Sequence, residues 1–268
     1  MATFNRTNQR LNNPNPAVAS IHYRTKENYF NNNGRGYQTP ELITLPSHNI
    51  KVELYCNRLK PNKLTTIQQA IQAVAAEFSN AVNLPLSPSA PQETFRIYLF
   101  DRKEDYQYFG GEEQFKWGLG SEGGKAHYRG RPEVHSELYL YQQGDTLNLK
   151  HELTHALTFY VTKGHSASIP TWLMEGIAEY FEHQKGVVHV SQQESQALTT
   201  EAINNLAYSD DPKENNLLYR MGHAMVSYLQ DQHPTLLGQY LSFRNNAQSE
   251  QADSLLQAIL SDLSSRFF

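Results

Sequence analysis

One pentapeptide, His151-Glu152-Leu153-Thr154-His155, constrains this chain more than any other feature of the sequence. Histidines at positions i and i+4 of a helix point from one face, so His151 and His155 can hold one zinc ion through two imidazoles. Glu152 then projects beside the metal, where a carboxylate can act as a general base. A catalytic zinc takes three protein ligands and keeps a position open for water. The pentapeptide therefore predicts a second element that brings a third ligand to the histidines.

The third ligand is expected from a second predicted helix, 171–183, which carries Glu175. Glu179 lies four residues later on the same face, so it can accept the far ring N–H of a zinc-bound histidine, and we expect that histidine to be His151. A row of acidic residues that also includes Glu182 is, by itself, typical of a solvated helix face. Beside a histidine pair, we favour Glu175 as a ligand and Glu179 as the residue that orients His151.

Composition excludes several classes of protein. The chain has 268 residues, 23 basic against 27 acidic, with a net charge of −4 and no dense Lys/Arg block, which argues against nucleic acid as a partner. Cys56 is the only cysteine, so disulfides within the chain and thiolate zinc sites are excluded. No signal peptide is visible, and no apolar stretch is long enough to span a membrane. We expect a soluble protein, either cytoplasmic or exported by a route that needs no signal peptide.

The order of the predicted elements indicates an α+β fold. Residues 1–40 are rich in Asn, Pro and Gly and predict a flexible tail, and residues 41–268 predict one domain with an upper lobe, 41–163, and a lower helical lobe, 164–268. Strands come first and helices later, which favours segregated layers over alternating βαβ units. Strands are predicted at 51–55, 95–100 and 137–141, and helices at 103–108, 147–160, 171–183, 201–208, 217–232, 234–243 and 250–263.

A further helix is expected between the first two strands. Thr66 and Gln69 have the spacing of an N-terminal capping box, and apolar residues recur behind them with helical period up to Val82. The pattern predicts a helix that begins at Thr66 and ends before Pro85.

Three segments of the chain resemble the gluzincins, zinc peptidases of which thermolysin is a familiar member. The nearest likeness is to the peptidase domain of bacterial collagenases, through Lys150–Leu157, Trp172–Tyr180 and Leu218–Met225. The stretch from Phe100 to Tyr128 is similar to the region of that family around its edge strand, and the whole resemblance covers about residues 95–229. It implies a thermolysin-like, two-lobed zinc peptidase domain, with an N-terminal sheet that has an edge strand and a mainly helical C-terminal lobe.

The resemblance also implies roles for single residues. It implies one zinc ion per chain held by His151, His155 and Glu175, with Glu152 as general base and Tyr219 as the tyrosine that helps to hold the oxyanion. His223 lies four residues beyond Tyr219 on the same helical face, and two interpretations stay open for it: a buried histidine without a catalytic role, or a second oxyanion donor. A calcium ion is compatible with this family, but no residue pattern here predicts one.

A glycine pair precedes a short extended segment that could border the cleft. An edge strand there would let an extended substrate pair with it in antiparallel fashion, and glycines would allow close approach. An ordinary turn followed by a strand is the alternative. The candidate substrate-binding residues are Gly123, Gly124, Lys125, Ala126 and His127.

The predicted function is zinc-dependent endopeptidase, or metalloendopeptidase, activity on a protein or peptide substrate. The alternative is a catalytically inactive, zinc-containing module that binds a peptide or protein in the same cleft. The resembling collagenases carry a large helical activator region and further modules, and 268 residues leave room for neither. We therefore expect extended or unfolded chains, rather than triple-helical collagen, as substrates; the sequence carries no signal for an oligomeric state.

Overall fold

The computed structural model describes residues 41–45, 49–56, 59–83, 92–100, 103, 106, 124–131, 134–141, 147–163, 165–183, 202–203, 205–209 and 211–267. The predicted tail, 1–40, lies outside the described residues, as do Gly123 and most of the predicted helix 103–108.

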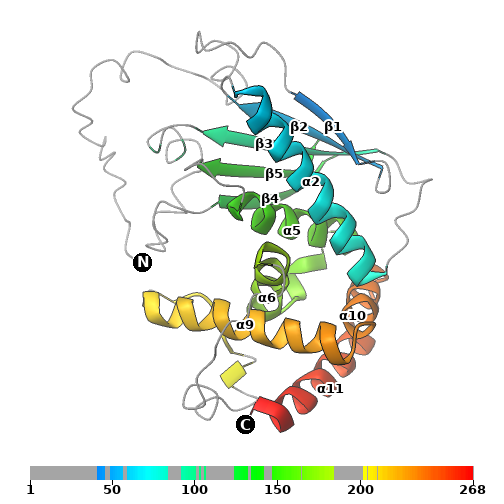
Figure 1. Cartoon of the computed structure of the whole chain (residues 1–268). Helices are drawn as coiled ribbons and strands as arrows, with labels where there is room; N and C mark the ends of the chain where they lie inside the picture. The colour runs from blue at the N-terminus through cyan, green and yellow to red at the C-terminus, as the bar shows by residue number, and fades with distance from the viewer. Residues whose placement is uncertain are drawn as a thin grey trace, which may run out of the picture.

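A mixed five-stranded sheet forms one side of the molecule (Figure 1). The strands are β1 (Glu41–Leu45), β2 (Ile50–Cys56), β3 (Glu93–Phe100), β4 (Gly124–Arg131) and β5 (Val134–Tyr141), in the spatial order β1-β2-β3-β5-β4. The three central strands run parallel, and β1 and β4 pair with them antiparallel at the two edges. The three predicted strands are confirmed as β2, β3 and β5, whereas β1 was not predicted.

Helix α2 (Pro61–Val82) connects two parallel strands, β2 and β3. Parallel neighbours cannot be joined by a hairpin, so the chain crosses over the sheet through a helix. The fold therefore contains one βαβ unit, β2-α2-β3, within the predicted α+β class. The predicted capping box is wrong: the helix begins at Pro61, a residue suited to the first turn, and Thr66 Oγ1 donates to the Asn62 carbonyl inside the helix. The end before Pro85 is confirmed.

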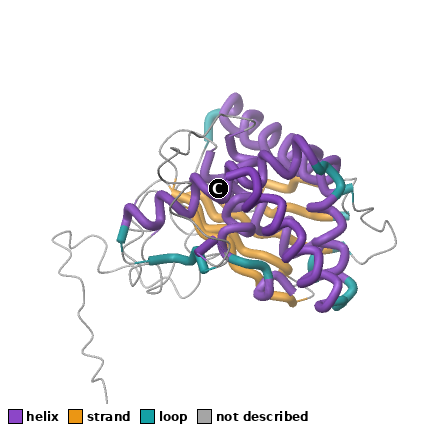
Figure 2. The backbone as a smooth tube through the Cα atoms, turned by 90° about the horizontal axis from the view of Figure 1, so that it is seen from below, coloured by secondary structure: helices purple, strands orange, loops and turns teal. Residues whose placement is uncertain are grey.

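Helices α2 and α5 (Leu147–Val161) share one hydrophobic core with a single face of the sheet. Leu153 and Leu157 of α5 are completely buried in this core. The opposite face carries a separate aromatic cluster, in which the Tyr98 ring stacks between the rings of Tyr55 and Tyr139. Seen from below, the helices form a layer across the strands (Figure 2). Because its apolar side is held by the sheet, α5 presents its other side to the helices below.

The described elements that follow α5 are all helical, which confirms the α+β class. They are η2 (His165–Ser168), α6 (Thr171–His183), α9 (Pro212–Gln232), α10 (Leu236–Asn245) and α11 (Ser249–Phe267). The predicted helix 201–208 is wrong: residues 202–203 are helical, but 205–209 have no helical structure. None of the described helices is both long enough and apolar enough to cross a membrane.

Helices α6 and α9 touch at a pair of glycines. A Cβ on Gly176 would overlap the carbonyl group of Gly222, and a Cβ on Gly222 would lie 2.6 Å from the Trp172 carbonyl oxygen. Two backbones can approach this closely only where neither residue has a side chain. The contact brings α9, and with it Tyr219, against the helix that carries Glu175.

Replacing Gly176 with alanine is expected to lower the free energy of unfolding by about 2 to 3 kcal/mol, because the new methyl group meets backbone atoms that cannot rotate away. Denaturant unfolding of the purified chain measures the change. Gly222→Ala tests the same contact from the other helix and should give a loss of similar size. Stability within about 0.5 kcal/mol of wild type for both variants would contradict the close crossing.

Candidate active site

Two histidines of α5 face each other one helical turn apart. His151 Nε2 lies 3.1 Å from His155 Nε2, and the ring centroids are 4.8 Å apart. The i, i+4 spacing places both rings on the side of α5 that is turned away from Leu153 and Leu157, which the core buries. The predicted histidine pair is thus brought together as the sequence pattern indicates.

Helix α6 adds the Glu175 carboxylate to this pair. Glu175 Oε2 lies 3.2 Å from His151 Nε2, and Oε1 lies 3.5 Å from His155 Nε2. Trp172 and Ile177 are completely buried on the apolar face of α6, so packing sets how the helix is turned. Glu175 is itself only 3% exposed, which is unusual for a glutamate unless its charge is compensated.

The three side chains fit a zinc ion. Their candidate ligand atoms all lie within 4.8 Å of one another. Ligand atoms about 2.05 Å from a tetrahedral zinc would be about 3.3 Å apart, close to the 3.1 Å between the two histidine Nε2 atoms and the 3.2 Å from His151 Nε2 to Glu175 Oε2. The spacing is therefore that of a ligand set rather than of a random surface cluster.

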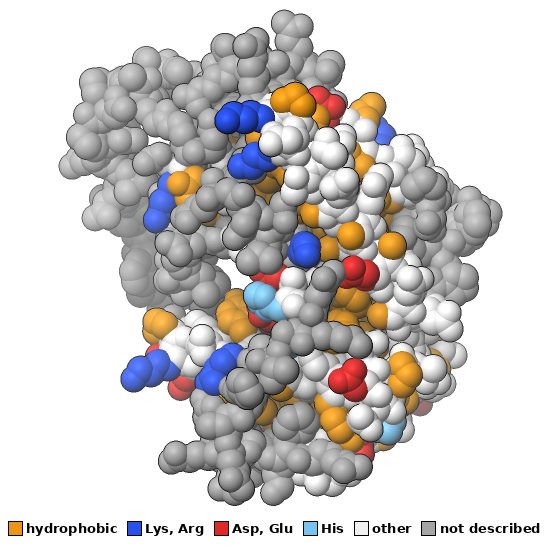
Figure 3. Space-filling model, in the orientation of Figure 1, with side chains coloured by type: hydrophobic (Ala, Val, Ile, Leu, Met, Phe, Trp, Pro, Cys, Tyr) orange, Lys and Arg blue, Asp and Glu red, His pale blue; other side chains and the backbone are white. Residues whose placement is uncertain are grey.

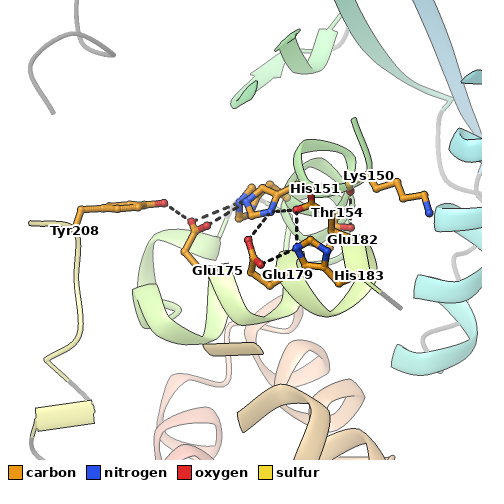
Figure 4. A network of polar contacts seen from close by, with 9 residues as sticks. Lys150, His151, Thr154, Glu175, Glu179, Glu182, His183 and Tyr208 are labelled. Atoms are coloured by element: carbon orange, nitrogen blue, oxygen red, sulfur yellow. Dashed lines mark hydrogen bonds and ion pairs between the residues drawn. The ribbon is translucent and has the colours of Figure 1, made fainter. Parts of the chain in front are cut away.

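Two further carboxylates approach the other nitrogen of His151 (Figure 4). Glu182 Oε2 lies 3.0 Å from His151 Nδ1, and Glu179 Oε1 lies 3.3 Å from the same atom. His183 Nε2 lies 3.2 Å from Glu179 Oε2. A proton on Nδ1 directed at these carboxylates leaves Nε2 with the lone pair that a metal requires. The contact predicted for Glu179 is present, and Glu182 makes a shorter one.

The charges around the histidines favour a cation. Burial by itself would raise the pKa of Glu175, but the charge of His155 and hydrogen bonds with both histidines hold that pKa well below its usual range. Burial likewise lowers the pKa of His151, yet hydrogen bonds with Glu175, Glu179 and Glu182 outweigh it and raise the pKa well above its usual value. Carboxylates thus stabilise positive charge at the point where the histidine nitrogens meet.

Glu152 lies between the histidine pair and the edge strand β4. It is 7% exposed, and burial raises the pKa of its carboxyl group, which the charges of His151 and His155 only partly oppose. A Cβ on Gly124 would overlap Glu152 Cγ and lie 2.9 Å from Glu152 Oε1. The glycine at the start of β4 therefore leaves the space that the Glu152 side chain occupies.

Two tyrosines lie near Glu175, one on each of two segments. The ring of Tyr219, on α9, lies edge-on to that of His151, with the centroids 6.3 Å apart. Tyr208 lies in the segment 205–209, and its hydroxyl group donates a hydrogen bond to Glu175 Oε1 (Figure 4). Desolvation of the hydroxyl groups and the charge of Glu175 raise the pKa of both tyrosines well above the usual value, so both hydroxyls remain proton donors.

His223 lies on the buried side of α9 and is 1% exposed. Its ring neighbours are Tyr180 and His183, at centroid distances of 6.4 and 6.2 Å, and neither ring nitrogen has a hydrogen-bond partner among the residues that the structure describes. These neighbours belong to the C-terminal half of α6, beyond Glu175. The role of His223 as a second oxyanion donor stays a prediction.

The candidate substrate-binding residues that the structure describes lie on β4, an edge strand of the sheet. Gly124 and Ala126 face α5, since Gly124 lies against Glu152 and Ala126 packs against the main core. Strand alternation puts Lys125 and His127 on the other face, where the His127 ring meets Tyr139. The edge strand is therefore confirmed as a structural element, and its binding of substrate stays a prediction.

The space-filling view shows histidine and acidic side chains beside a hollow in the middle of one face, between the sheet and α9 (Figure 3). Lysine and arginine side chains appear above and below them on the same face.

Comparison with known proteins places the chain in a family. The family model described as Collagenase, a peptidase family, matches residues 44–267. The chain belongs to the collagenase family of peptidases. It is similar to a microbial collagenase of Vibrio vulnificus (strain CMCP6), at 24% identity over 218 residues, which are 75% of this chain and 26% of that protein. It is also similar to a microbial collagenase of Vibrio parahaemolyticus serotype O3:K6 (strain RIMD 2210633), at 24% identity over 202 residues, 68% of this chain and 24% of that protein.

Membership in the collagenase family agrees with the resemblance seen in the sequence. The chain spans about a quarter of the length of these two collagenases.

Sequence reasoning missed two residues of the site. Glu182 lies three residues beyond Glu179 and seven beyond Glu175, so helical periodicity already placed all three on one face. Tyr208 had no comparable signal, because it was expected inside a helix and reaches Glu175 from a segment without helical structure.

Proposed function

We propose that this chain is a zinc-dependent endopeptidase of the gluzincin type, which hydrolyses peptide bonds in protein or peptide substrates. The observation that carries the proposal is the meeting of two histidines from α5 and one glutamate from α6 at a single point, with Glu152 beside them. Family membership supports the same class of chemistry.

His151, His155 and Glu175 are the residues that would hold the ion, one per chain. When bound, zinc supplies a Lewis acid that acidifies water and polarises a carbonyl group. Glu179 and Glu182 keep His151 in the tautomer that offers Nε2, because both accept from the Nδ1 side.

The protein groups around this centre have distinct roles in the proposal. Glu152 takes a proton from the attacking water and returns it to the amine that leaves. Its buried position favours this exchange, since burial raises the carboxyl pKa toward neutrality. Tyr219 donates a hydrogen bond to the carbonyl oxygen of the substrate as negative charge develops there, a contribution of about 3 kcal/mol for one good donor.

The arrangement of elements suits an extended substrate. Strand β4 lies at the edge of the described sheet, where a peptide could pair with it in antiparallel fashion, which would lay the peptide backbone along α5 and past Glu152. In this proposal the sheet and α5 lie on one side of the bound peptide, and α6 and α9 lie on the other. This arrangement supports a two-lobed, thermolysin-like domain. Neither the family nor the site favours the alternative of a non-catalytic binding module.

Metal analysis together with cleavage of a random peptide library tests the proposal. The purified full chain is expected to carry about one zinc ion and to cut library peptides at internal bonds, and a chelator should abolish cleavage. Cleavage that persists undiminished after complete removal of metal would overturn the mechanism. A zinc-loaded chain that cuts neither the library nor casein would instead support the binding module.

A further inference from the structure

The hydroxyl group of Tyr208 binds Glu175 Oε1, which is not the oxygen that contacts His151. Glu175 Oε2 is the atom close to His151 Nε2, at 3.2 Å, whereas Tyr208 donates to Oε1. Figure 4 shows the tyrosine reaching the carboxylate from the side opposite the glutamates around His151. Oε1 also lies 3.5 Å from His155 Nε2, so both oxygens face the histidine pair, and Oε1 is the one that the Tyr208 hydroxyl occupies.

The segment that carries Tyr208 is held in place by helix α9. Asn215, in the first turn of α9, accepts a hydrogen bond from Ser209 N at 2.8 Å and donates one to Ser209 O at 2.7 Å. Asn215 is buried, and Ser209 Oγ also accepts from Asp211 N, the N-cap residue of the helix. The side-chain amide of Asn215 thus makes two hydrogen bonds to the backbone of Ser209. These bonds fix the residue next to Tyr208 and so direct the Tyr208 ring toward Glu175.

A carboxylate near zinc can bind through one oxygen or through both. Bidentate binding would fill the position that a hydrolytic site keeps for water. A hydroxyl that occupies one oxygen favours binding through the other, and an ordinary tyrosine, with a pKa of about 10, keeps its proton at neutral pH. Partners of this kind orient ligands and strengthen their hold on the metal.

We propose that Tyr208 is a positioning residue for the metal centre: its hydroxyl holds Glu175 Oε1, so that the carboxylate offers only Oε2 to zinc. Asn215 acts on the metal centre only through Tyr208, because its side chain hydrogen-bonds to the backbone of Ser209. This inference rests on the proposed function, which supplies the zinc ion. It assigns to Tyr208 no contact with substrate.

Zinc affinity of Tyr208→Phe, measured by competition with a chromophoric chelator, tests the proposal. The dissociation constant is expected to rise about 10- to 100-fold, the usual effect of losing a partner of a metal ligand. Asn215→Ala should weaken binding less, because the tyrosine is retained but held loosely. Tyr128→Phe is the matched control: Tyr128 and Tyr208 are both 41% exposed, and the Tyr128 ring packs against His135 and Phe159 instead.

Two further measurements separate positioning from general damage. Metal-free Tyr208→Phe should still unfold in one cooperative transition and keep the helix content of the wild type, with a midpoint lowered by no more than the loss of one hydrogen bond explains. Cobalt put in place of zinc should show altered visible absorption in this variant, because those bands depend on coordination number.

The possible outcomes are distinct. Zinc affinity of Tyr208→Phe within twofold of wild type, with an unchanged cobalt spectrum, would overturn the inference and leave the proposed function standing. A wild-type chain that takes up no zinc at all would overturn both.

Discussion

Replacing Glu152 with glutamine is expected to reduce peptide hydrolysis by about 100- to 10,000-fold while zinc stays bound. Glutamine has nearly the same shape and fills the same space beside β4, but it cannot accept the proton of the attacking water. The three candidate metal ligands, His151, His155 and Glu175, are untouched by this change. Loss of activity without loss of metal would separate a general base from a ligand.

The measurement pairs casein cleavage with zinc analysis of the same preparation. Glu214→Gln is a suitable control, because Glu214 is an exposed carboxylate in the first turn of α9 and should keep full activity. Cleavage by Glu152→Gln within tenfold of the wild-type rate would show that another group takes the proton. Loss of zinc along with activity would contradict the role assigned here to Glu152.

A methyl group at Gly124 is expected to reduce hydrolysis by at least about 100-fold, since Gly124→Ala acts on the same general base from the neighbouring strand. The new Cβ would overlap Glu152 Cγ and lie 2.5 Å from Leu140 Cδ2. Leu140 lies in the core, so Glu152 is the side chain that has to move. A displaced carboxylate no longer meets the water at hydrogen-bonding distance.

Zinc affinity and the unfolding midpoint distinguish displacement of Glu152 from damage to the site as a whole. Zinc affinity should change little in Gly124→Ala, because the ligands lie on helices and not on β4, and the unfolding midpoint should fall only as far as the overlap with Glu152 and Leu140 requires. Tyr128→Phe serves as the comparison on the same strand, since the Tyr128 ring packs against His135 and Phe159 and is not among the candidate substrate-binding residues. Wild-type activity in Gly124→Ala would show that Glu152 tolerates the added group, and that the glycine has no part in placing it.

These two variants address one point from two directions. Glu152→Gln removes the carboxylate that accepts the proton and keeps the shape of the side chain. Gly124→Ala keeps the Glu152 carboxylate and changes its position. Similar losses with zinc retained would locate the function at the contact between α5 and β4.

Much of the fold followed from patterns within single segments. The helix 171–183 was predicted with the bounds that α6 has, because its apolar residues recur with helical period right up to the end. The start of α2 was misplaced because Thr66 and Gln69 imitate a capping box, while Pro61 is the residue that opens the helix. The short edge strand β1 was not predicted. The parallel pairing of β2 and β3 could not be predicted from the sequence of either strand alone.

The histidine pair of the candidate metal site could be predicted from the sequence alone, because histidines at i and i+4 share a helix face whatever surrounds them. The same local rule put Glu175, Glu179 and Glu182 on one side of α6. Packing alone decided which carboxylate comes nearest to His151 Nδ1, that Gly124 makes room for Glu152, and that Tyr208 reaches Glu175. Spacing along a helix is a property of its backbone, whereas contact between segments far apart in the chain depends on how a whole core is filled.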